Sequence, residues 1–407
     1  MTSHSSRRSN SIIEKPEWIE AVRQRAAERY FSDGFCIEGL EITLNAVDPS
    51  FVRWVFKYLQ PLSLGSPGPK KEACRFYCLY SDELASEAAA YFMVEDNIDF
   101  LGRLKNGSVL KCAQFGDDLA VYCNGPEGVV WLADFDTQSI FMIFSSRTRR
   151  PALEFSRSVR EVVASYLTDQ GWALFHAGAV ETSEGALMIV GDPGAGKTSL
   201  LLALLSGGAR YIANELLFVR LEEERVRVLG YPLVVAVGLG TAMHLPGLRP
   251  LIEEPDPLLY PRRRFDAERV ARTKPDDWPS LDDKLQLLPE ELGSYVETPG
   301  FVPGGELRAI VVPELSKQAT GPKVAQLAPD AAYDVLADNM LEPMNVGSSK
   351  TWSRMVVRGL PQNDEEQCLE RLANMNAVKL SFDLSSSVDH AVYLDVLLAG
   401  LSERTRL

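Results

Sequence analysis

ALMIV (residues 186–190), GDPGAGKT (residues 191–198) and SLLLALL (residues 199–205) follow one another near the middle of a chain of 407 residues. The first run is apolar throughout, as buried strands are, and the third is rich in Leu and Ala, as helices are. The run between them matches the pattern G-x-x-x-x-G-K-T. A strand, a glycine-rich loop and a helix in this order predict a phosphate-binding loop at residues 191–198, which we call the phosphate loop.

The residue types in the phosphate loop fit a nucleoside triphosphate. Its glycines allow backbone conformations in which successive N–H groups point at a phosphate beside a helix N-terminus. Lys197 would reach the β- and γ-phosphates, and Thr198 would offer its hydroxyl to Mg²⁺. We therefore expect ATP, or another nucleoside triphosphate, together with Mg²⁺. The predicted contact residues are Gly191, Asp192, Pro193, Gly194, Ala195, Gly196, Lys197, Thr198 and Ser199.

Charge and hydrophobicity exclude several classes of function. The formal net charge is −14, and hydrophobic residues make up 46% of the chain. An acidic chain repels nucleic acid and anionic membrane surfaces. The N-terminus is polar, and no run approaches the length of a membrane span. We predict a cytoplasmic globular protein without nucleic-acid or membrane partners, whose six cysteines are reduced core thiols because they form no C-x-x-C pair.

Hydrophobic patterning divides the chain into parts on either side of residue 150. Residues 1–15 are predicted to be a disordered tail, and residues 16–150 an α+β lobe built mainly from an antiparallel sheet. Residues 151–407 are predicted to form an α/β domain around the phosphate loop. Within that domain, residues 246–292 are rich in Pro and charged residues and predict an exposed, mobile excursion.

Polar residues inside two apolar runs are candidates for catalysis. Phosphoryl transfer needs an acidic group beside the phosphate loop. Of the three acids that follow apolar runs, we prefer Glu215 over Glu314 and Asp134, because Asn214 and Glu215 together interrupt the predicted strand Arg210–Val219. Two polar residues inside a buried strand are costly unless something polar faces them. His176 lies in the predicted strand Trp172–Val180, and a buried structural histidine is its simpler interpretation.

These runs together resemble one family of enzymes. The runs FHAGAV (residues 175–180), GDPGAGKT (191–198) and GGARYIANE (207–215), with the apolar strand at residues 307–312, are similar to the catalytic domain of HPr serine kinase/phosphorylase. The resemblance covers the chain from about residue 165, and is closer to HPr-kinase-related proteins of peptide-modification pathways than to the enzyme that acts on HPr. It implies a P-loop HPr-kinase-like nucleotide-binding domain with an N-terminal α+β lobe.

The resemblance also implies roles for single residues. His176 matches the family histidine, Lys197 and Thr198 match the nucleotide-binding residues, and Glu215 matches an acid that serves the metal, so Thr198 and Glu215 would hold Mg²⁺. The family's other acid, the base toward the substrate serine, falls on Asn214. An asparagine cannot accept that proton at neutral pH. His176 or Glu215 would have to replace the base.

Two functions follow from these residues. The first is an ATP-dependent kinase that phosphorylates a Ser/Thr hydroxyl of a peptide or small protein. The second is a nucleotide-binding scaffold with little catalysis, which presents a peptide to partner enzymes of a peptide-modification pathway. Asn214 favours the scaffold, whereas the intact Gly196-Lys197-Thr198 favours at least binding. A nucleotide hydrolase is a weaker third option, and the oligomeric state, including a homo-oligomer, stays open.

Overall fold

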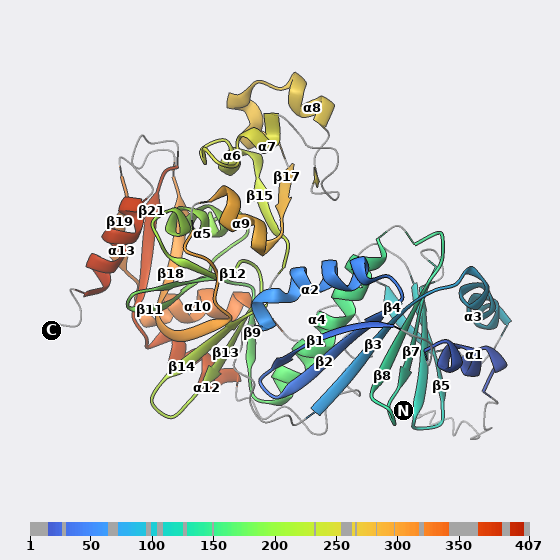
Figure 1. The fold of residues 1–407 in the computed structure, drawn as a ribbon. Coiled ribbons are helices and arrows are strands. Elements are labelled where there is room, and N and C mark those ends of the chain that lie inside the picture. Colours follow the sequence, from blue (N-terminus) through green and yellow to red (C-terminus); the bar gives the residue numbers. More distant parts are fainter. Residues whose placement is uncertain are drawn as a thin grey trace, which may run out of the picture.

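The structure is a computed structural model with a mixed α/β fold, in which the described residues form three sheets (Figure 1). Of the tail predicted at residues 1–15, only Lys15 lies within the described residues. The described residues are 15–26, 30–63, 72–94, 99–103, 109–124, 128–148, 150–231, 233–253, 263–264, 267–281, 283–296, 298–316, 321–341, 365–384 and 391–402.

The N-terminal lobe is built on an eight-stranded sheet. Its pairs are antiparallel except for β2 with β3 and β3 with β8, which are parallel. In spatial order the strands are β1 (Phe31–Ile37), β2 (Leu40–Ala46), β3 (Glu72–Tyr80), β8 (Ser139–Phe144), β7 (Val129–Asp134), β6 (Leu119–Asn124), β5 (Val109–Phe115) and β4 (Asp99–Arg103).

Helices cover both faces of this sheet, because its strands alternate between two apolar faces. One face packs against α1 (Glu17–Ala26) and α3 (Asp82–Val94). The other packs against α2 (Pro49–Ser63) and α4 (Pro151–Asp169). Buried side chains of the second half, among them Leu216, belong to the same core as α2 and α4. The two halves therefore share one continuous hydrophobic core.

The second half is built on a ten-stranded mixed sheet. Its long central strand is β18 (Gly304–Leu315). Near its start β18 pairs antiparallel with β14 (Val226–Gly230), and further along it pairs parallel with β11 (Gly185–Ile189) and β21 (Ala377–Phe382). The main path is β12 (Arg210–Ala213), β10 (Gly178–Thr182), β11 (Gly185–Ile189), β18 (Gly304–Leu315), β14 (Val226–Gly230), β13 (Leu217–Leu221), β9 (Ala173–Phe175) and β20 (Met340–Leu341). Beside it, β21 (Ala377–Phe382) pairs with β18 and with β19 (Lys323–Gln326).

Two helices lie on each face of this second sheet. Helices α5 (Lys197–Ser206) and α13 (Ala391–Ser402) contact one another and contribute to one core. Helices α10 (Pro329–Asn339) and α12 (Glu365–Ala373) contribute to the other. Because β11 and β18 are parallel, their carboxyl ends meet at the edge where α5 begins, which is where ligands bind in sheets of this kind.

The described residues within 235–295 project from the second half next to α5 and contain a small third sheet (Figure 1); we call them the projection. Its elements are β15 (Val235–Gly238), α6 (Leu239–Ala242), α7 (Pro250–Glu253), β16 (Arg263–Arg264), α8 (Ala267–Arg272), a 3-10 helix (Pro275–Ser280), β17 (Lys284–Leu287) and α9 (Pro289–Tyr295). Most of it comes from the stretch expected to be an exposed excursion at residues 246–292. Instead, Leu248, Trp278 and Leu287 are buried in the core that contains α5. The sequence had not revealed this, since the buried positions follow no single period.

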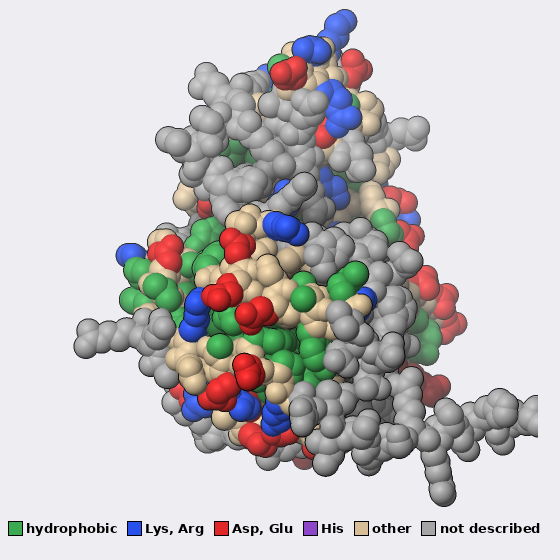
Figure 2. Space-filling model, turned by 90° about the vertical axis from the view of Figure 1, so that its right-hand side faces the viewer, with side chains coloured by type: hydrophobic (Ala, Val, Ile, Leu, Met, Phe, Trp, Pro, Cys, Tyr) green, Lys and Arg blue, Asp and Glu red, His purple; other side chains and the backbone are tan. Residues whose placement is uncertain are grey.

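The surface agrees with an acidic, mixed-charge protein. On the face shown in Figure 2, acidic and basic side chains are interspersed with apolar ones. Among the described residues, no helix combines the length and the hydrophobicity that a membrane span requires. All six cysteines are free thiols, and Cys74, Cys78, Cys123 and Cys368 are buried.

Candidate active site at the end of strand β11

The chain between β11 and α5 turns sharply at its glycines. Gly194 and Gly196 have φ values of 86° and 101°, which are left-handed conformations that favour glycine. A side chain at Gly196 would also meet Leu315 at 3.0 Å and Phe382 at 3.2 Å, which lie at the carboxyl ends of β18 and β21. The loop is therefore packed against the ends of the parallel strands.

The start of α5 presents N–H groups that have no acceptor among the described residues. Gly194, Gly196, Lys197 and Thr198 donate no backbone hydrogen bond to any described residue. The first N–H groups of a helix lack partners inside the helix and carry its partial positive charge. N–H groups in this arrangement are suited to bind an anion.

Lys197 lies folded back over this loop. Its Nζ donates hydrogen bonds to the carbonyl oxygens of Gly191 at 2.6 Å and Asp192 at 3.2 Å. Partial burial lowers the pKa of Lys197, while the carboxylates of Asp192 and Glu215 act in the opposite direction. Backbone carbonyl groups therefore hold the ammonium group, which forms no ion pair with a described residue. An entering anion can displace these carbonyl groups from the ammonium.

Two strand interruptions meet beside the loop. The sequence predicted single strands at Trp172–Val180 and Arg210–Val219. In the structure the first is divided into β9 and β10, and the second into β12 and β13. β10 pairs with β12, and β9 pairs with β13. Ala179 pairs with Ala213 on one side of the break, and Phe175 pairs with Leu217 on the other. His176, Asn214 and Glu215 fall in these breaks, with His176 directly after Phe175 and Asn214 directly after Ala213.

Asn214 is the most buried polar residue of these three. It is 3% exposed, and its side-chain oxygen Oδ1 has no hydrogen-bond partner among the described residues. A buried polar atom without a partner is costly, and such sites take an ordered water or a ligand group. His176 is partly buried, and its backbone N–H donates to the carbonyl of Asn339 at 2.8 Å.

Glu215 connects the two parts of the site electrostatically. It is only partly buried, and its charge partly offsets the lowering of the Lys197 pKa by burial and adds to the raising of the Tyr211 pKa by burial. Within the described residues, no three His, Cys, Asp or Glu side chains gather closely enough to hold a metal by themselves. A hydroxyl, a carboxylate and phosphate oxygens are the ligands Mg²⁺ takes beside a nucleotide. Thr198 and Glu215 carry a hydroxyl and a carboxylate, which are ligands of these types.

Ser199 faces away from the loop. Its Oγ lies 2.7 Å from Oγ1 of Thr241 on α6, and its side chain is buried. The hydroxyl of Ser199 therefore joins the phosphate-loop helix to the projection. The sequence gave no sign of this contact, because Thr241 lies 42 positions further along the chain.

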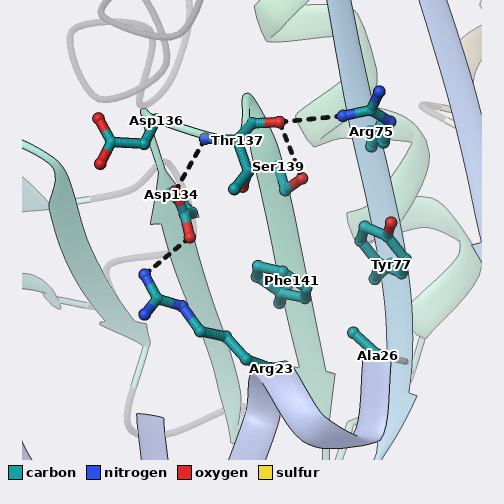
Figure 3. Close-up of a pocket in the computed structure, with 9 residues that line it drawn as sticks. All are labelled: Arg23, Ala26, Arg75, Tyr77, Asp134, Asp136, Thr137, Ser139 and Phe141. Carbon is teal, nitrogen blue, oxygen red and sulfur yellow. Dashed lines mark hydrogen bonds and ion pairs between the residues drawn. The ribbon is translucent and has the colours of Figure 1, made fainter. Parts of the chain in front are cut away.

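The two other acids lie in different surroundings. Glu314 is exposed near the end of β18 and pairs with Lys379 at 2.6 Å. Asp134 lies in the N-terminal lobe, where it accepts hydrogen bonds from Arg23 at 2.8 Å and from the backbone of Thr137 at 3.0 Å (Figure 3). It lines a pocket of about 540 Å³ between α1 and the sheet, and its carboxylate holds a turn and a helix together.

No family model matches this sequence, and no curated protein matches it. Among solved structures, the chain is similar to an Hpr(Ser) kinase/phosphatase from Coxiella burnetii. The identity is 10%, the match covers 57% of this chain and 92% of that chain, and the TM-score is 0.25. The similarity is distant.

Proposed function

We propose that the protein binds a nucleoside triphosphate with Mg²⁺ at the phosphate loop and transfers its terminal phosphoryl group to a Ser or Thr hydroxyl. The acceptor would be a peptide or small protein. The observation that carries the proposal is the set of N–H groups at the start of α5 without an acceptor among the described residues, beside the displaceable Lys197 ammonium. Mg²⁺ would supply neutralisation of charge on the phosphate oxygens.

The residues of the chain would stabilise charge and accept the proton. Lys197 and the loop N–H groups would stabilise negative charge on the transferring group. In the reaction the bond from the terminal phosphorus to its bridging oxygen breaks, a bond to the acceptor oxygen forms, and the acceptor proton leaves. Glu215 or His176 would accept that proton, since Asn214 cannot.

A second function is supported by Asn214 itself. An amide at the position of the expected base, with its oxygen buried and without a partner, suits a site that holds a ligand but transfers slowly. The protein would then be a nucleotide-binding scaffold that presents a peptide to partner enzymes.

Calorimetry of Mg²⁺ with a nonhydrolysable triphosphate analogue tests the binding step. We expect Lys197→Ala to weaken binding by more than about tenfold, because a charge-assisted contact to phosphate is lost. Lys323→Ala, which changes an exposed lysine on β19, is the control and should bind like the wild type. Equal affinity of the wild type and Lys197→Ala would contradict the proposal.

Mass spectrometry separates the two functions. Peptides encoded beside the gene are incubated with the protein, ATP and Mg²⁺, and the gain of one phosphate on a Ser or Thr supports the kinase. Nucleotide binding without any such gain supports the scaffold.

A further inference from the structure

Three polar side chains from both halves of the molecule gather at the junction beside the candidate site. Tyr58 belongs to α2, Arg160 to α4, and Tyr231 follows β14; we call them the junction cluster. The Tyr58 hydroxyl accepts a hydrogen bond from the N–H of Val234 at 3.4 Å, and the N–H of Tyr231 donates to the carbonyl of Leu216 at 3.3 Å. Because Leu216 follows Glu215, the cluster borders the strand interruption.

Two members of the cluster have unsatisfied polar atoms. Tyr231 is 0% exposed, and its hydroxyl has no hydrogen-bond partner among the described residues. The Nε of Arg160 is buried and equally without a partner, and its guanidinium makes no ion pair with any described residue. Buried polar groups in proteins are nearly always paired, so this concentration of unpaired groups requires an explanation.

The cluster contains more donors than acceptors. A guanidinium carries five N–H donors and no acceptor, and each tyrosine hydroxyl adds one donor. Burial raises the pKa of both Tyr58 and Tyr231, and the nearby Arg160 charge only partly offsets this. Both hydroxyls therefore stay protonated at neutral pH. The carboxylate of Glu161 on α4 is also buried, and its charge acts on Tyr231, but it accepts no hydrogen bond from the Tyr231 hydroxyl.

Arg160 is also accessible from outside the core. Its side chain is partly exposed although its Nε is buried. By contrast, Arg157 on the same helix is largely exposed and forms an ion pair with Glu154 at 2.9 Å. An arginine that is partly desolvated and lacks a carboxylate partner is suited to bind one, or a phosphate, through two parallel hydrogen bonds.

We propose that the junction cluster is a binding subsite for an oxyanion, a phosphate or carboxylate group carried by the molecule on which the candidate site acts. Both oxyanions offer acceptors for the Nε–H of Arg160 and the hydroxyl of Tyr231, which have no partner among the described residues. The existence of the subsite does not depend on nucleotide binding, but its role in positioning an acceptor rests on the proposed function. The N-terminal lobe would then contribute substrate-binding residues through α2 and α4.

Glu215 connects the junction cluster with the candidate active site. Its carboxylate interacts electrostatically with Lys197 of the phosphate loop and with Tyr58 of the cluster. The N–H of Tyr231 bonds to the carbonyl of Leu216, the residue after Glu215, so a molecule anchored at the cluster would lie close to Glu215.

Calorimetric titration of the full-length protein, with inorganic phosphate and with acetate in separate arms, tests the subsite. The titrations use the wild type and Lys197→Ala, since that variant weakens binding at the phosphate loop. In the Lys197→Ala background, we expect Arg160→Gln to weaken the remaining oxyanion binding at least about tenfold. Tyr231→Phe should weaken it by about tenfold or more, the effect of losing one hydrogen bond to a charged group.

Arg157→Gln is the matched control on α4 and should leave the binding unchanged. Binding of either anion that depends on Arg160 supports the subsite, and the arm in which it occurs identifies the chemistry. The proposal is overturned if Lys197→Ala binds neither anion, or binds one equally well after Arg160→Gln, while thermal melting shows that the variants are folded. Neither result affects the nucleotide titration, which tests the proposed function separately.

Discussion

In the proposed function, Asn214 is the residue that separates a catalyst from a scaffold. It directly follows β12 at the strand interruption, and its side-chain oxygen is buried and has no partner among the described residues. An amide and a carboxylate have nearly the same shape, so Asp fits the same space. The two side chains differ in whether they can accept a proton, which makes position 214 a direct test of the chemistry.

Asn214→Asp should raise phosphoryl transfer, or ATP hydrolysis when no acceptor is present. The expected increase is up to about 10²–10⁴-fold, the usual contribution of a general base. Steady-state rates with ATP and Mg²⁺ measure it, with Asn339→Asp as the control because Asn339 is also buried but its side chain bonds to Val335 on α10. A wild-type turnover of about 1–100 per second, ordinary for kinases, would assign the base role to Glu215 or His176.

At the scale of elements, the hydroxyl contact between α5 and α6 connects the phosphate loop to the projection. Ser199 belongs to the first turn of α5, and Thr241 belongs to the element that follows β15. The projection also buries Leu248 and Trp278 in the core that contains α5. The position of the projection is therefore set by the helix that begins at the phosphate loop.

A double-mutant cycle of Ser199→Ala and Thr241→Ala should give a coupling energy of about 1 kcal/mol, the net value of a hydrogen bond. Unfolding in urea measures the stability of each variant. Ser206 is the control, because its hydroxyl bonds to the carbonyl of Leu202 within α5. Ser206→Ala and Thr241→Ala should therefore be additive. Additivity of Ser199→Ala and Thr241→Ala as well would show that their contact contributes nothing.

At the scale of the whole molecule, the two halves are joined by charge as well as by the shared core. Glu38, in the turn between β1 and β2, pairs with Arg227 at 3.0 Å and with Arg220 at 3.6 Å. The Tyr166 hydroxyl of α4 donates to the carbonyl of Glu38 at 2.9 Å. These contacts cross between residues far apart in sequence, so the lobes are held in one arrangement.

The buried thiols make the stability of the whole molecule sensitive to alkaline pH. Burial raises the pKa of Cys123 to about 11 and of Cys368 to about 12, from 9.0. Above pH 9 the unfolded chain loses these protons first, so the native state binds more protons and stability falls as pH rises. Between pH 8 and pH 10, the wild type should lose on the order of 1 kcal/mol more than Cys368→Ala.

Urea unfolding of both proteins at the two pH values measures this difference. Cys36→Ala changes a partly exposed thiol and is the control. Equal losses in the wild type and Cys368→Ala would mean that the Cys368 thiol ionises as readily in the native protein as in the unfolded chain.

The sequence by itself determined the local elements around the phosphate loop. Residues 186–205 form a strand, a loop and a helix, because glycine conformations, apolar runs and helix propensity act over a few neighbouring residues. It also marked Asn214 and Glu215, since polar residues in an apolar run are visible without a structure. The roles of these residues in binding and catalysis stay predictions.

Only the tertiary structure decided what these elements meet. The two interrupted strands pair on both sides of their breaks, the Ser199–Thr241 contact attaches the projection, and the charge of Glu215 acts on Tyr58 of the other lobe. Each contact joins residues tens of positions apart or more. Their proximity depends on strand register and on packing of the shared core, and a pattern that repeats every two or four residues carries no information about either.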